Sequence, residues 1–199
     1  LQYRDIARKI AKLHLLFKHA GINKEEKIAL CGKNSTQWAV AFMAAMTYGA
    51  VPVPILHEFK PDQIHNLLNH SDSRILFCDF SIYKSIDITT SPEVDAVFNI
   101  ADYSLLYSKN TDIDYARAHL NELFGKSYPE RFTPNDVVYE KPDVNRLAII
   151  NYTSGSTGFS KGVMIPYRAI SSNIDFGLQK LTFLGPKDNT ICMLPMAHM

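Results

Sequence analysis

A segment rich in glycine and hydroxyl side chains, YTSGSTGFSKGV at residues 152–163, directly follows the apolar run LAII at residues 147–150. Its glycines let the backbone adopt positive φ and approach a ligand closely, its hydroxyls can turn toward an anion, and its lysine adds positive charge. Convergent donors of these three kinds are what a phosphate group needs, so the segment predicts a triphosphate-binding loop. The glycines are Gly155, Gly158 and Gly162, and the other donors are Thr153, Ser154, Ser156, Thr157, Ser160 and Lys161.

The same composition leaves other interpretations open. Glycine and serine are also the commonest turn residues, so a solvated hairpin turn on a Rossmann-like domain is one alternative. A P-loop is excluded by spacing, because the sixth position from Gly155 is Ser160 and Lys161 is followed by Gly162. The sequence also lacks a GxGxxG dinucleotide fingerprint. The extended residues GVMIPY that follow Lys161 indicate a loop that joins two strands and lacks the helix N-terminus of P-loop proteins.

Strand-like and helix-like segments alternate along the chain and must position this loop. Residues 3–20 place apolar side chains at helical spacing, with a stop near Gly21, and Asn34 or Ser35 offers an N-cap for a second helix. The two prolines of GAVPVPI confine this strand to an edge or an irregular position. The alternation favours an α/β fold with a mainly parallel sheet flanked by helices on both faces. Further strands are expected at 28–32, 74–79, 94–100, 147–152 and 189–195, and further helices from Pro61, over 114–124 and over 166–184.

Composition limits the classes of partner. The 21 basic and 20 acidic side chains nearly cancel, so no domain-wide field favours nucleic acid or an anionic membrane. No apolar run approaches the ~20 residues of a membrane span. Three cysteines in apolar surroundings are expected to be buried thiols in a reducing compartment, which favours a cytoplasmic protein. These cysteines are Cys31, Cys78 and Cys192.

The remaining features carry less chemistry. Residues 127–143 are rich in proline and charge and are expected to form a connecting loop within one architecture. Trp38, Phe42 and Met46 lie at helical spacing and are expected in the core. The three histidines His57, His65 and His70 lack a carboxylate or thiol that would complete a zinc site, so no protein-built metal site is expected.

The sequence resembles a known family. YTSGSTGFSKGV is similar to the phosphate-loop signature of the adenylate-forming (AMP-binding) superfamily, which includes acyl-CoA synthetases, firefly luciferase and peptide-synthetase adenylation domains. EKIALCGKNSTQWAVAFMAAMTYGAVPVPI resembles the early strand, Asn-Ser turn and helix of that family, and LPMAHM resembles its Leu-Pro-Leu-Ala-His segment in long-chain fatty acid–CoA ligases. The resemblance covers essentially all 199 residues.

The resemblance implies a two-step reaction. A carboxylate attacks the α-phosphate of Mg-ATP to give acyl-AMP and pyrophosphate, and the thiol of coenzyme A then displaces AMP. It implies ATP, Mg²⁺ and coenzyme A as cofactors or substrates, and a fatty acid as the second substrate. Lys161 would balance charge on departing pyrophosphate, and His198 would lie near the substrate carboxylate. The residues matched to the loop around the β- and γ-phosphates are Thr153, Ser154, Gly155, Ser156, Thr157, Gly158 and Lys161.

The chain also departs from the family pattern. Ser160 stands where many members have proline before the lysine, which removes a φ restraint but no phosphate donor. The later Gly-Tyr-Gly-x-Thr-Glu segment, the ribose-binding aspartate and the C-terminal domain have no counterpart before Met199, so residues 1–199 are expected to be an inactive N-terminal part of a longer enzyme. A ligase that feeds a carrier protein and a non-catalytic phosphate-binding module remain as alternatives, and an oligomer is neither required nor excluded.

Overall fold

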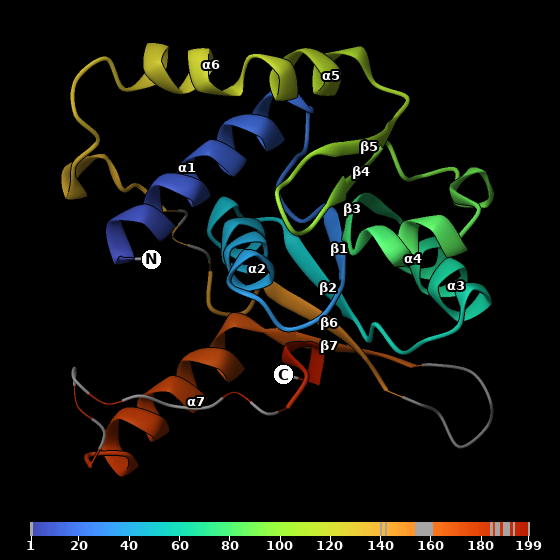
Figure 1. Ribbon diagram of the computed structural model, residues 1–199. Helices are drawn as coiled ribbons and strands as arrows, with labels where there is room; N and C mark the ends of the chain where they lie inside the picture. The colour runs from blue at the N-terminus through green and yellow to red at the C-terminus, as the bar shows by residue number, and fades with distance from the viewer. Residues whose placement is uncertain are drawn as a thin grey trace.

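The computed structural model describes residues 2–139, 141, 143–153, 161–183, 185, 188, 192 and 194–198. Their main feature is a five-stranded sheet with the strand order β2-β1-β3-β4-β5 (Figure 1). The first four strands in this order are parallel, and β5 is antiparallel to β4. The strands are β1 (Lys27–Cys31), β2 (Val51–Ile55), β3 (Ser73–Cys78), β4 (Ala96–Asn99) and β5 (Leu105–Ser108).

Helices cover both faces of this sheet, as the alternation of segments predicted. In Figure 1, α1 and α2 lie on one side of the strands, and α3 and α4 lie on the other. The longer helices are α1 (Tyr3–His19), α2 (Thr36–Tyr48), α3 (Pro61–Ser71) and α7 (Tyr167–Lys180). The shorter ones are α4 (Phe80–Ser85), α5 (Thr111–Ala118), α6 (Leu120–Ser127) and the 3₁₀ turns η1 (Ile88–Thr90), η2 (Pro134–Asp136) and η3 (Met196–His198).

Helix limits follow local chemistry. The Ser35 hydroxyl caps α2 by accepting the backbone N–H of Trp38 at 3.0 Å, which decides between the two predicted caps. Gly49 ends the same helix with a left-handed φ of 92°. Pro61 begins α3 at its first position, as expected from its fixed φ.

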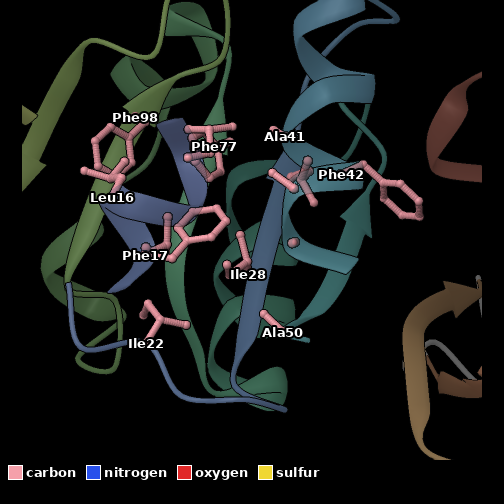
Figure 2. Packing of buried hydrophobic residues seen from close by; sticks show 14 of the residues in the cluster. Leu16, Phe17, Ile22, Ile28, Ala41, Phe42, Ala50, Phe77 and Phe98 are labelled. Carbon is pink, nitrogen blue, oxygen red and sulfur yellow. The ribbon is translucent and has the colours of Figure 1, made fainter. Parts of the chain in front are cut away.

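The core is double because alternate residues of a strand face opposite sides of the sheet. Ile28 and Leu30 of β1 belong to a cluster with α1, α2 and α5, whereas Ala29 and Cys31 belong to a cluster with α3 and α4. Figure 2 shows the first cluster, in which Leu16 and Phe17 of α1 lie against aromatic side chains of β3 and β4. These aromatic residues are Phe77 and Phe98, whose rings stack with centroids 5.2 Å apart.

A separate hairpin of β6 (Leu147–Thr153) and β7 (Lys161–Pro166) lies beside β2 (Figure 1). The backbone N–H of Val51 is directed to the β1 side, where it donates to the Glu26 carbonyl at 2.9 Å. Backbone groups alternate between the two edges of a strand, so the nitrogens of Pro52 and Pro54 lie at the edge away from β1 and offer no N–H there. The prolines therefore confine β2 to the edge of the sheet, as predicted. They also leave β2 without two backbone N–H groups that could have bonded to the hairpin.

The structure corrects several expectations. The helix expected over 114–124 is two helices, because the chain leaves helical geometry at His119, whose N–H and ring Nδ1 both contact the Tyr115 carbonyl. The last long helix ends at Lys180 rather than near residue 184. Cys31 and Cys78 are buried as expected, but Cys192 is exposed, so that expectation was wrong. The strand expected over 189–195 lies mostly outside the described residues, and its described positions 192, 194 and 195 are not in a strand.

Candidate functional site

The hairpin brings the two described ends of the predicted phosphate loop together. In the antiparallel β6–β7 pair, Thr153 is the register partner of Lys161, and Tyr152 is the partner of Gly162. Thr153 and Lys161 are both exposed, so their hydroxyl and ammonium groups stand at the open end of the hairpin. The inference from GVMIPY that the segment joins two strands is therefore confirmed. Ser154, Gly155, Ser156, Thr157 and Gly158 lie outside the described residues.

Polar side chains tie the hairpin to the main domain at the end remote from the loop. The Arg146 guanidinium, directly before β6, donates to the Gly49 carbonyl at 3.2 Å and pairs with Glu25 at 2.9 Å. The Tyr167 hydroxyl, directly after β7, donates to the Met46 carbonyl at 2.9 Å. The base of the hairpin is thus fixed to the region where α2 ends and β2 begins.

A second anchor lies at the loop end. Tyr152, the residue before Thr153, is buried, and its hydroxyl is hydrogen-bonded to Nδ1 of His70 at 2.7 Å. The two rings meet edge to face with centroids 5.6 Å apart. Burial raises the pKa of the Tyr152 phenol. His70 belongs to the last turn of α3, 82 residues earlier in the chain.

Gly162 completes this arrangement from β7. A Cβ at this position would lie 3.2 Å from Cγ2 of Ile150 and 3.3 Å from Cε1 of Tyr152. A larger residue here would therefore require the Ile150 and Tyr152 side chains to shift by a few tenths of an ångström. The pairing of a strand glycine with a cross-strand aromatic ring places the ring directly over the start of β7, next to Lys161.

The second predicted site residue, His198, lies in η3 near the described end of the chain. Its neighbour Ala197 is buried in the same cluster as Ala148 and Ile149 of β6, and η3 lies against β2. His198 is exposed, and its backbone N–H donates to the Pro195 carbonyl at 2.9 Å. The histidine and the hairpin therefore belong to one region of the molecule, linked through β2 and β6.

Asn34 holds this segment and was not singled out by sequence reasoning beyond its candidacy as an N-cap. Its side-chain amide donates to the Leu194 carbonyl at 2.7 Å and accepts the Met196 backbone N–H at 2.7 Å. The Asn34 amide thus donates one hydrogen bond to the backbone of this segment and accepts one from it, as the backbone of a paired strand does. The signal that could have identified it is its place directly after β1, because ligands of open α/β sheets bind beyond the carboxyl ends of the strands.

The turn that carries Asn34 is itself fixed against β3. The Lys33 backbone N–H donates to Oδ2 of Asp79 at 2.9 Å, and a Cβ at Gly32 would lie 3.2 Å from Oδ1 of the same carboxylate. Asp79 follows β3, and the order β2-β1-β3 makes the junction of β1 and β3 the switch point of the sheet. The segment carrying His198 is therefore held at this switch point.

The part of the chain that the structure describes holds neither a cluster of metal-ligating side chains nor a membrane-spanning helix. There, no three His, Cys, Asp or Glu side chains gather closely enough to hold a metal ion. None of the described helices combines the length and apolar character needed to cross a bilayer.

Sequence comparison decides the family. The AMP-binding enzyme family matches residues 1–199, the whole chain. The chain belongs to the AMP-binding enzyme family. Among curated relatives of this AMP-binding chain, "Long-chain-fatty-acid--CoA ligase 5" of Rattus norvegicus is 24% identical over 212 residues, covering 100% of this chain and 30% of the relative. A "4-chlorobenzoate--CoA ligase" of Arthrobacter sp is 26% identical over 200 residues, covering 100% and 34%.

Solved structures support the fold of the AMP-binding chain. ATP-bound MatB from Rhodopseudomonas palustris superposes with a TM-score of 0.76 at 20% identity, covering 100% of this chain and 36% of MatB. At this identity the likeness shows the shared fold. The chain spans about a third of the length of these two curated relatives and of MatB.

Proposed function

We propose that this chain supplies the phosphate-binding part of an ATP-dependent acid–CoA ligase, with a long-chain fatty acid as its acid. The observation that carries the proposal is the register pair of Thr153 and Lys161 at the open end of the β6–β7 hairpin. The pair sets a hydroxyl donor and a cation at the two ends of a segment that, apart from Phe159, consists of glycine, serine and threonine. Family membership supports ATP as the nucleotide.

The proposed chemistry has a carboxylate oxygen attack the α-phosphorus of ATP while pyrophosphate leaves. Negative charge accumulates on the departing β- and γ-phosphates, so fixed donors and a cation there lower the barrier. Lys161 is the proposed cation, and Thr153 with Ser154, Gly155, Ser156, Thr157 and Gly158 are the proposed donors. When bound with ATP, Mg²⁺ would neutralise part of the same charge.

His198 is proposed to line the space that the carboxylate enters. Asn34 would then act as its support, because it fixes the backbone of Leu194 and Met196 at the switch point of the sheet. The choice of a long-chain acid is supported by LPMAHM and by the name of the rat relative. A "4-chlorobenzoate--CoA ligase" is as similar to this chain, so the acid must be tested directly.

The test uses the full-length enzyme, from which pyrophosphate release is measured with ATP, Mg²⁺ and one acid at a time. Palmitate, an aromatic acid such as 4-chlorobenzoate, and no acid form the panel. We expect release with palmitate and none without acid, followed by a palmitoyl thioester when coenzyme A is added. Release with the aromatic acid alone would overturn the long-chain assignment. An acyl-AMP that does not react with coenzyme A would favour a ligase that feeds a carrier protein, and no release with any acid would favour a non-catalytic phosphate-binding module.

A further inference from the structure

The position of the hairpin depends on side chains, because β2 offers it two prolines where ladder donors would stand. Because the Val51 N–H donates toward β1, backbone alternation puts the nitrogens of Pro52 and Pro54 at the opposite edge of β2, beside β6. A strand pair without a continuous ladder to its neighbour can tilt or slide, so specific anchors must fix it. Arg146 and Tyr167 fix the end remote from the loop, as their bonds to Gly49 and Met46 show.

At the loop end, three observations converge on the Tyr152 ring. Its hydroxyl is 2.7 Å from Nδ1 of His70. Its ring edge meets the imidazole at 79°. On β7, Gly162 leaves room for the ring, since a Cβ at residue 162 would lie 3.3 Å from Cε1 of Tyr152. The ring is therefore held between α3 and β7.

The consequence for the site follows from register. Tyr152 is bonded in sequence to Thr153, and its cross-strand partner Gly162 is bonded to Lys161. A ring that is fixed in place fixes the backbone on both sides of the open end at once. We propose that His70 and Tyr152 are a positioning pair, which holds Thr153 and Lys161 where they meet the phosphates of ATP. Neither residue of the pair touches the nucleotide.

This inference rests on the proposed function and deepens it, because it names the residues that set the geometry of the phosphate contacts. A hydrogen bond of this kind changes an equilibrium by about threefold to tenfold. If the pair positions the phosphate contacts, the loss falls on ATP and leaves the acid unaffected. A merely structural bond would lower thermal stability and leave the balance between the two substrates unchanged.

The test compares variants of the full-length enzyme by the KM for ATP, the KM for the acid and the midpoint of thermal unfolding. Tyr152→Phe removes the hydroxyl and keeps the ring, and His70→Ala removes the partner. Tyr103→Phe is the matched control, because the Tyr103 hydroxyl is also hydrogen-bonded, to the Gln37 carbonyl at 2.8 Å, but Tyr103 belongs to the cluster on the other face of the sheet. We expect each of the first two variants to raise the KM for ATP about threefold to tenfold with the KM for the acid unchanged. The control should change neither.

Two further variants sharpen the result. The double variant Tyr152→Phe/His70→Ala should be no worse than either single variant, because both remove the same bond. His70→Asn places an amide near the position of Nδ1 and should restore the KM for ATP to within about twofold of the wild type. Additive losses, or a KM for ATP that stays at the wild-type value in both single variants, would overturn the inference.

The proposed function and the positioning pair fail in different ways. If the wild-type enzyme releases no pyrophosphate with any acid, the proposed function is wrong, and the pair is then judged by the dissociation constant of Mg-ATP. A larger dissociation constant of Mg-ATP in Tyr152→Phe, together with an unchanged one in Tyr103→Phe, supports the positioning pair. Equal dissociation constants in the wild type, Tyr152→Phe and Tyr103→Phe contradict the positioning pair. A wild-type protein that binds no Mg-ATP overturns both proposals.

Discussion

Asn34 accepts a hydrogen bond from the backbone N–H of Met196 at 2.7 Å, although 162 residues separate them. The same amide donates to the Leu194 carbonyl. Segment 194–198 therefore takes its place from a side chain in the turn after β1. The position of His198 consequently depends on a residue that sequence order gives no reason to connect with it.

Replacing Asn34 should free the segment that it holds. We expect Asn34→Ala to raise the amide exchange rate of Met196 by about tenfold, since a bond worth about 1.4 kcal/mol is lost. Asn34→Asp keeps the acceptor oxygen and should have a smaller effect on Met196. Hydrogen exchange followed by mass spectrometry or NMR measures this directly. Asn66→Ala, an exposed position in α3, is the control, and equal exchange in the Asn34 and Asn66 variants would contradict the assigned role.

The three cysteines should react at very different rates. Burial raises the pKa of Cys31, and burial together with the nearby Asp79 raises that of Cys78 to about 12, so few thiolates form at pH 8. Cys192 is exposed and should be the one thiol that a disulfide reagent modifies quickly in the native chain. Full reaction of all three is expected only in denaturant. Cys192→Ser should abolish the fast phase, and a fast phase that survives this change would contradict the burial of the other two.

Stability should fall in mild acid because of His14. Its Nε2 lies 3.1 Å from the Ala44 carbonyl and 3.0 Å from the Thr47 hydroxyl, and burial lowers its pKa below the ordinary 6.5. The unfolded chain therefore binds the proton more readily than the native chain. As pH falls below about 6.5, the free energy of unfolding should decrease by no more than about 1.4 kcal/mol per pH unit, and the decrease should level off below the native pKa.

Urea unfolding of His14→Gln at pH 5 and pH 7 tests this assignment. The variant should lose the part of the pH dependence that His14 contributes. His19→Gln, an exposed histidine in the last turn of the same helix, should retain the wild-type dependence. If the two variants show the same dependence as the wild type, another group is responsible.

The exposed apolar side chains of α7 and of the residues after it should bind an apolar dye in the 199-residue chain. Phe176 and Leu178 are 63% and 75% exposed, and Phe183 after the helix is 74% exposed. Exposed apolar side chains that gather in one region mark a binding surface. We expect Phe176→Ser/Leu178→Ser to reduce the fluorescence of bound anilinonaphthalene sulfonate severalfold. Tyr3→Ser removes one exposed ring at the N-terminal end of α1 and should leave the signal near its wild-type level, and a reversed order of the two effects would contradict this interpretation.

Local chemistry made much of the fold predictable. Ser35 and Pro61 mark helix starts by their own hydrogen-bonding and φ properties, and Pro52 and Pro54 restrict β2 to an edge for the same kind of reason. The break at His119 depends on competition for one carbonyl, which periodicity does not reveal. Strand β5 has four residues and gains its place by antiparallel pairing with β4, so its own sequence carries little signal.

The candidate site was predictable only in its local part. The hairpin ends at Thr153 and Lys161 follow from a glycine-rich segment between two extended runs. His70 and Asn34 were not predicted as site residues, because their partners lie 82 and 160 or more residues away. Each is a single polar residue near the end of an element, and its role exists only once the chain is folded.

The most direct test of the account is single-turnover pyrophosphate release by the full-length enzyme with Lys161→Ala. Loss of a preorganised charge at the leaving group should slow release about 100-fold, with an unchanged unfolding midpoint because Lys161 is exposed. Lys180→Ala, an exposed lysine in the last turn of α7, should release pyrophosphate at the wild-type rate. A Lys161→Ala enzyme that releases pyrophosphate as fast as the wild type would contradict the claim that this hairpin binds the phosphates of ATP.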